Sequence, residues 1–208
     1  NPEQSTPSNQ PRAINPEQSS SVCTRVFSNK GYKGARLKPL RVPLPGSCFP
    51  ALHNLSNTFM ASGLVTGCGK GIGLATVARL LRQGDQVVGI SRSLTPGISG
   101  LLRKFKSTFY FLECDISDKL QLSKSIAESI SILSVIDYAI ANAGIRSRCS
   151  IQESSLDLYS KVFDINTLSQ VHLTKCLVQH SVACNTSLKL LYITSIVGVR
   201  GFSDLSTY

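Results

Sequence analysis

The chain of 208 residues lacks the marks of a membrane, secreted or metal-binding protein. Glu128 and Asp137 interrupt the longest candidate apolar stretch, so no run reaches the roughly 20 residues that a membrane-spanning helix needs. The seven cysteines are an odd number without a Cys-x-x-Cys pair, which gives no sign of a disulfide framework or a zinc site. We therefore expect reduced thiols, a cytoplasmic location, no metal centre and no membrane partner.

Clustered positive charge is also lacking, although the formal net charge is +10. Lysines and arginines are scattered over the chain, and the most basic cluster, Arg103, Lys104 and Lys106, falls at a predicted helix end. Nucleic-acid binding requires a basic patch or stripe, so we interpret these charges as a solvated surface. No nucleic-acid partner is expected.

Acidic residues are scarce at the start of the chain, where Glu3 and Glu17 are the only ones before position 59. Much of the proline lies there too, and the only methionine, Met60, stands just before the first predicted strand. We interpret residues 1–59 as a disordered or non-native extension, with Met60 as the natural start. A transit peptide is the alternative, since the stretch is rich in Ser and basic residues, but no amphipathic helix is evident.

Glycines are concentrated between Thr66 and Gly73, where the chain reads Thr-Gly-Cys-Gly-Lys-Gly-Ile-Gly. An apolar strand precedes this turn and a run with helical periodicity follows it. Gly67 suits a tight turn, Gly71 leaves room for backbone to approach a pyrophosphate, and Gly73 lets the helix pack closely on the sheet. The free N–H groups of the helix start then face the phosphates. The pattern predicts a dinucleotide-binding site.

A Walker-type phosphate loop is the competing interpretation of a glycine-rich turn. It needs Ser or Thr after its Lys and a Gly five positions before its second Gly. Gly71 follows Lys70, and Leu64 stands five positions before Gly69, so this interpretation fails. Cys68, within the turn, is interpreted as filler, with a reactive thiol at a helix N-terminus as the alternative.

Predicted strands and helices alternate along the remaining chain. The helix after the turn ends before Gly84, and further helices are predicted at residues 98–106, 119–133 and 156–182. Strands are predicted at residues 63–65, 86–90, 108–112, 135–140 and 188–194. This alternation indicates an α/β protein with a doubly wound parallel sheet, a Rossmann fold with strand order 3-2-1-4-5. Its ligand crevice should lie at the carboxyl ends of the strands.

From Met60 to Tyr208 the chain resembles the short-chain dehydrogenase/reductase family. The glycine turn matches the family's Thr-Gly-x-x-x-Gly-x-Gly form, and Asn142-Ala143-Gly144 matches its Asn-Ala-Gly element. Asn166 lies in the long predicted helix where the family has a structural and catalytic Asn. Ser195 and Tyr208 stand thirteen positions apart, as the family's Ser and Tyr do.

The resemblance implies the roles of the site residues. Tyr208 would be the acid/base toward a carbonyl or alcohol, Ser195 would hold the substrate oxygen, and Asn166 completes the catalytic set. The expected cofactor-binding residues are Thr66, Gly67, Gly69, Lys70, Gly71, Ile72, Gly73, Ser91, Arg92, Asp115, Asn142, Ala143 and Gly144. Asn142 is expected to brace the fourth strand rather than touch substrate. Asp115 would contact the adenine amino group, with a turn cap as the alternative.

The end of the second predicted strand favours NADP(H) over NAD(H). An Asp or Glu there usually binds the adenosine ribose hydroxyls, but Ser91 and Arg92 occupy this place, and Asp85 lies at the wrong end of the strand. Arg92 and Lys70 can pair with a 2′-phosphate. We therefore expect residues 60–208 to form an NADP-binding Rossmann domain.

The expected function is hydride transfer between nicotinamide and a carbonyl or alcohol substrate. The family's Lys, four residues after its Tyr, lies beyond Tyr208, so we interpret the sequence as an inactive fragment whose last strands are missing. We expect a homodimer or homotetramer in the full-length protein. The alternative is a non-catalytic nucleotide-binding or redox-sensing protein on the same fold.

Overall fold

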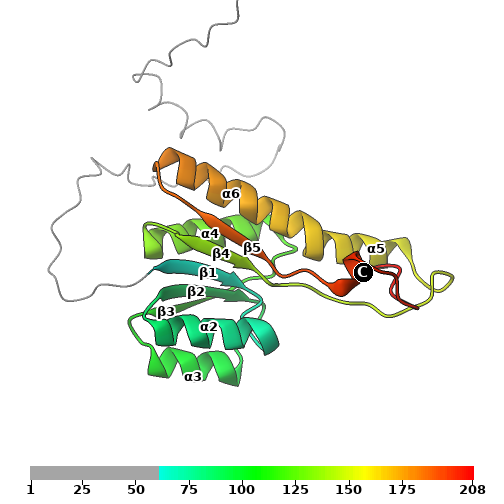
Figure 1. Ribbon diagram of the computed structural model, residues 1–208, viewed down its shortest axis with the longest axis horizontal. Coiled ribbons are helices and arrows are strands. Elements are labelled where there is room, and N and C mark those ends of the chain that lie inside the picture. Colours follow the sequence, from blue (N-terminus) through cyan, green and yellow to red (C-terminus); the bar gives the residue numbers. More distant parts are fainter. Residues whose placement is uncertain (1–60) are drawn as a thin grey trace, which may run out of the picture. The chain divides into compact units, whose positions relative to one another are not determined.

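The computed structural model describes residues 61–208, which form a five-stranded parallel sheet with helices on both faces (Figure 1). Residues 1–59, interpreted as an extension, lie outside the described residues. In chain order the elements are β1 (Ser62–Thr66), α2 (Gly71–Gln83), β2 (Gln86–Ser91), α3 (Pro96–Lys104), β3 (Phe109–Glu113), α4 (Lys119–Leu133), β4 (Tyr138–Ala141), α5 (Leu156–Phe163), the π-helical turn η2 (Asp164–Leu168), α6 (Ser169–Ala183), β5 (Lys189–Tyr192) and the 3₁₀ turn η3 (Ile196–Gly198).

The strand order is β3-β2-β1-β4-β5, which confirms the predicted doubly wound topology. β1 lies in the centre, where Val65 is paired with Gly89 of β2 on one side and with Ile140 of β4 on the other. The chain reverses its direction of travel across the sheet between β1 and β4. In folds of this type the ligand crevice lies outside the carboxyl ends of the strands at this switch point.

Each face of the sheet has its own apolar core, because successive strand residues point to opposite faces. Leu64 belongs to the cluster on the side of α4 and α6. Val65, the next residue, belongs to the cluster on the side of α2 and α3. Figure 1 shows α2 and α3 on one face of the sheet and α4 with α6 on the other.

Several helix ends follow from local sequence signals. α2 ends at Gly84, whose left-handed φ of 97° lets its N–H reach the carbonyl oxygens of Leu80 and Leu81. α4 begins after Asp118, whose carboxylate accepts hydrogen bonds from the N–H groups of Leu120 and Gln121. The predicted stop at Gly84 and the predicted helix 119–133 are both confirmed.

Most predicted elements differ from the structure by one or two residues at their ends, as α3 and β5 do, and two differ more. The fourth strand begins at Tyr138 rather than at residue 135, because Ile136 is buried in the preceding loop and an apolar run alone cannot distinguish the two. The helix predicted at 156–182 contains the π-helical turn Asp164–Leu168 between α5 and α6. Within residues 61–208, none of the helices has both the length and the apolar character required to cross a membrane.

Candidate active site

The glycine turn follows the carboxyl end of β1. Its backbone adopts a conformation that a side chain would disrupt. Gly67 has a left-handed φ of 69°, and a Cβ there would lie 2.8 Å from Ala143 Cα. Its N–H donates to the carbonyl oxygen of Ile90 at the end of β2, over 2.8 Å. The turn is therefore tied to the neighbouring strand, and glycine is the residue that fits position 67.

Gly73 brings the first turn of α2 against this loop. A Cβ on Gly73 would lie 2.2 Å from Gly67 O and 2.6 Å from Asn142 Nδ2, and neither atom can withdraw without breaking the turn. This is the close helix packing that the sequence predicted for Gly73.

Gly71 is the position in the same turn where the surrounding space is free. It has a left-handed φ of 55°, and a Cβ placed there would meet nothing within 4 Å. Lys70, at the N-cap of α2, makes no side-chain cap hydrogen bond, and Lys70, Gly71 and Ile72 are all exposed. The uncapped N–H groups and the positive end of the helix dipole are suited to an anion such as a pyrophosphate.

Asn142, directly after β4, braces the glycine turn. Its side-chain Nδ2 donates to the carbonyl oxygens of Thr66 and Gly67, over 3.0 and 3.2 Å. In return, the buried Thr66 hydroxyl accepts from the backbone N–H groups of Asn142 and Ala143, each over 3.1 Å. The side chain of Asn142 therefore holds β1 and β4 together, and does not brace the fourth strand alone.

Asn166, in the π-helical turn, fixes the chain that leaves β4. Its Oδ1 accepts from the N–H of Ile145 and its Nδ2 donates to the carbonyl oxygen of Ile145, both over 2.8 Å. Gln170 lies four residues later and donates to Ala143 O over 2.9 Å. A Cβ on Gly144 would lie 3.3 Å from Asn166 Oδ1. The sequence analysis missed Gln170, and its only signal was the four-residue spacing from Asn166 on one helix.

The end of β2 lies against the glycine turn. A Cβ on Gly69 would be 2.9 Å from Ser91 Oγ. Thr95, which caps α3, donates its hydroxyl to Gly69 O over 2.8 Å and accepts from Ile98 N over 3.3 Å. The sequence analysis also missed Thr95, although a Thr before Pro96 is a recognisable helix start.

Arg92 and Asp115 lie at the same edge of the sheet, after β2 and β3. Asp115 accepts hydrogen bonds from the N–H and the hydroxyl of Ser117, over 3.0 and 2.8 Å. Hydrogen bonding from Ser117 lowers the pKa of Asp115, and the positive charge of Arg92 lowers it further. Asp115 therefore caps the turn after β3 with one carboxylate oxygen, and the exposed Arg92 is within electrostatic reach of it. The contact of Asp115 with the adenine stays a prediction.

Cys68 packs in the apolar core beneath the glycine turn. It is fully buried, and burial raises the pKa of its thiol to about 12. A thiol held in its protonated form is a poor nucleophile, so the reactive-thiol alternative is not supported.

Tyr208 and Asn166 share a cavity of about 370 Å³. Ser195 lies after β5, and its hydroxyl accepts from Val197 N over 3.3 Å to begin η3. None of the hydrogen bonds within residues 61–208 joins Ser195 to Tyr208. Tyr208 and Asn166 thus line one cavity, whereas the Ser195 hydroxyl accepts a hydrogen bond within a local turn. The same residues contain no group of three or more His, Cys, Asp or Glu side chains able to hold a metal ion.

The sheet order, the glycine turn and the uncapped start of α2 define a Rossmann-type nucleotide-binding domain. The sequence model described as short chain dehydrogenase matches residues 63–208. The chain therefore belongs to the short-chain dehydrogenase/reductase family.

Two curated relatives illustrate the match. An uncharacterized oxidoreductase of Schizosaccharomyces pombe is 32% identical over 146 residues, which are 70% of this chain and 57% of that protein. A 2-dehydro-3-deoxy-D-gluconate 5-dehydrogenase of Pseudoalteromonas atlantica is 33% identical over 141 residues, 66% of this chain and 55% of the relative. The chain thus spans somewhat more than half the length of these relatives.

Solved structures share the fold. A short-chain dehydrogenase from Streptomyces avermitilis has a TM-score of 0.67 at 22% identity, with 71% of this chain and 54% of that chain covered. ElxO with bound NADP has a TM-score of 0.65 at 24% identity, with coverage of 71% and 60%. An NADH-dependent reductase in complex with NAD has a TM-score of 0.64 at 25% identity, with coverage of 71% and 65%.

Proposed function

We propose that the protein is an NADP(H)-dependent oxidoreductase that transfers a hydride between nicotinamide and a carbonyl or alcohol substrate. The observation that carries this proposal is the glycine turn at the carboxyl end of β1. Neighbouring atoms leave no room for a Cβ at Gly67 or Gly73, but the space beside Gly71 is free, next to the uncapped N-terminus of α2. Such an arrangement suits a pyrophosphate, which a dinucleotide would provide.

Residues at neighbouring strand ends fit the other parts of the cofactor. Lys70 and Arg92 would pair with a 2′-phosphate, and both are exposed cations without an ion pair among residues 61–208. Asp115 would remain available to the adenine through the carboxylate oxygen that Ser117 does not engage. When bound, NADPH would supply the hydride.

Tyr208 is proposed as the proton donor to the substrate oxygen. Hydride addition to a carbonyl carbon leaves an alkoxide, which requires a proton source and a positioned hydrogen-bond donor. The Tyr208 hydroxyl would give its proton to this oxygen, and the Ser195 hydroxyl would donate a hydrogen bond to it. For this, Ser195 must turn its O–H toward the substrate while its oxygen still accepts from Val197 N, which one hydroxyl can do. Asn166 would act by positioning the chain around the cavity that it shares with Tyr208.

The comparisons support the reaction class and leave the choice of nucleotide to this chain's own residues. One relative acts as a dehydrogenase on a sugar acid, and the structural neighbours include one with NADP and one with NAD. Ser91 and Arg92, in place of an acidic residue after β2, favour NADP(H). We further propose a small-molecule substrate, a cytoplasmic location and a homodimeric or homotetrameric full-length protein.

The test is a fluorescence titration of the full-length protein with NADPH and with NADH, followed by carbonyl-reduction assays. We expect tighter binding of NADPH. Tyr208→Phe should reduce kcat by at least about 100-fold with nearly unchanged NADPH affinity, because it removes the proton donor only. Tyr110→Phe, on edge strand β3, is the matched control and should keep full activity. Failure to bind either nucleotide would refute the proposal, and binding without reduction of any carbonyl would favour the non-catalytic alternative.

A further inference from the structure

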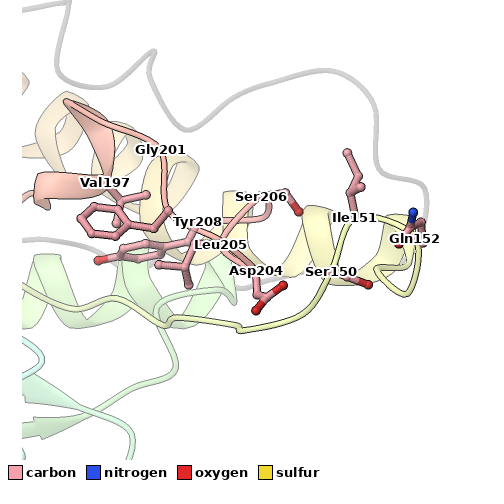
Figure 2. Close-up of a pocket in the computed structure, with 10 residues that line it drawn as sticks. Ser150, Ile151, Gln152, Val197, Gly201, Asp204, Leu205, Ser206 and Tyr208 are labelled. Carbon is pink, nitrogen blue, oxygen red and sulfur yellow. The ribbon is translucent and has the colours of Figure 1, made fainter.

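Tyr208 also lines a second, larger cavity of about 570 Å³, to which Asn166 does not contribute (Figure 2). Two segments form it. Figure 2 shows Ser150 to Gln152, from the loop after β4, on one side, and residues of the C-terminal segment after β5 on the other. Apolar side chains contribute much of the wall, namely Ile151, Val197, Phe202 and Leu205.

Among the residues that the structure describes, Asp204 is the only charged one that lines this cavity. Within residues 61–208, no ion pair or side-chain hydrogen bond engages its carboxylate. The nearby cation, Arg200, stacks on the ring of Phe202 at 4.6 Å from the ring centroid and does not pair with Asp204. The carboxylate therefore gives the cavity a negative charge that no partner within it cancels.

The backbone holds Asp204 at this place. Its φ of 59° is left-handed, a conformation that Asp and Asn tolerate better than most other residues. Its carbonyl oxygen accepts from the N–H of Cys149 over 2.9 Å, and Cys149 also forms a parallel bridge with Leu205. The two walls of the cavity are thus joined at the backbone of Asp204, which places its Cα at the cavity wall.

We propose that Asp204 selects substrates by charge. The cavity would accept carbonyl or alcohol substrates that are apolar and carry an amino group, and it would disfavour those that carry a carboxylate. This inference rests on the proposed function, because it assumes that the substrate reacts beside Tyr208. The apolar wall would bind the carbon skeleton, and Coulomb attraction would bring the ammonium group toward Asp204.

Three ketones of equal length test this inference in the full-length protein: an amino ketone, an uncharged ketone and a keto acid. Asp204→Asn is the informative variant, because Asn keeps the size of the side chain and tolerates the left-handed backbone. The ratio of kcat/KM for the amino ketone to that for the keto acid should fall by about tenfold in the variant. Turnover of the uncharged ketone should change by less than about twofold. Asp157→Asn, in the exposed first turn of α5, is the control and should leave the ratio unchanged.

Equilibrium binding separates this inference from the proposed function. The same three ketones are titrated by ligand-observed NMR into wild type and Asp204→Asn. If wild type turns over none of the three, the proposed reaction fails for these substrates, and the titration still decides about Asp204. Equal affinity of wild type for the amino ketone and the keto acid, or a preference that Asp204→Asn retains, would overturn the charge selection. A preference lost in the variant and weakened by salt supports it.

Discussion

The side-chain amide of Asn166 and the backbone of Ile145 form a reciprocal pair of hydrogen bonds, each 2.8 Å long. The amide thus satisfies both backbone groups of a residue that belongs to no strand or helix. It also lies in the π-helical turn between α5 and α6. π-helical turns are rare in proteins as a whole, but many of those that occur lie at functional sites. This agrees with the position of Asn166 beside the cavity that Tyr208 lines.

Asn166→Asp is expected to destabilise the protein. The substitution keeps an acceptor for the N–H of Ile145 but places a carboxylate oxygen against its carbonyl oxygen. The lost donor should lower the free energy of unfolding by about 1–3 kcal/mol, measured by urea denaturation. Asn185→Asp, the same change at an exposed position after α6, should alter it by less than about 0.5 kcal/mol. Equal effects of the two substitutions would contradict the role given to the Ile145 pair.

Gly73→Ala should damage the nucleotide site, because a Cβ would lie 2.2 Å from Gly67 O. We expect a loss of about 1–3 kcal/mol in the free energy of unfolding and at least tenfold weaker NADPH binding. Gly100→Ala is the matched control in α3, where a Cβ meets nothing within 4 Å. That variant should be equally stable or up to about 1 kcal/mol more stable, with unchanged NADPH binding. If Gly73→Ala bound NADPH like wild type, the close approach would be unimportant for the site.

The sequence predicted most of the sheet and the glycine turn because these depend on short-range patterns. Alternating strands and helices restrict the topology through right-handed crossovers. Gly67 and Gly84 mark left-handed conformations that few other residues adopt, and Gly73 marks a close approach that leaves no room for a Cβ. The π-helical turn was missed, since its apolar spacing resembles that of an ordinary helix.

Contacts between loops could not be predicted in the same way. Thr95 and Gln170 hold backbone carbonyls of segments far away in the sequence, at Gly69 and Ala143. The position of Asp204 depends on its left-handed backbone and on the hydrogen bond from Cys149. No local pattern encodes these long-range pairings. The cavity beside Tyr208 therefore could not be predicted from the sequence and was found only in the structure.

Arg92→Asp should weaken the preference for NADPH over NADH. The change removes a partner for the 2′-phosphate and adds a carboxylate where ribose hydroxyls are usually bound. We expect the ratio of the two dissociation constants, measured by fluorescence titration of the full-length protein, to move toward NADH by at least about tenfold. Arg79→Asp makes the same charge change on the exposed face of α2, more than two helical turns beyond Gly71, and should leave the ratio unchanged. An unaltered preference in Arg92→Asp would argue against the role of Arg92.

His172 on α6 should make stability depend on pH. Its Nε2 lies 2.8 Å from the Ser123 hydroxyl, which already donates to Lys119 O, so Nε2 carries the proton and donates to Ser123. Burial lowers the pKa of His172, and the charges of Lys175 and Lys119 lower it further. Between the lower folded pKa and the unfolded value of about 6.5, the unfolded chain binds more protons. Stability is therefore complete above that unfolded value and declines as the pH falls toward the folded one.

His172→Gln should flatten this dependence between about pH 7.5 and pH 5.5, because it removes the group that titrates in that window. The measurement is the urea midpoint at several pH values, together with the His172 titration followed by NMR. Gln179→Ala, at an exposed position of the same helix, removes no titratable group, so it is the control and should keep the wild-type slope. A His172 titration at or above the unfolded pKa, or an equal flattening by both variants, would show that another group causes the acid sensitivity.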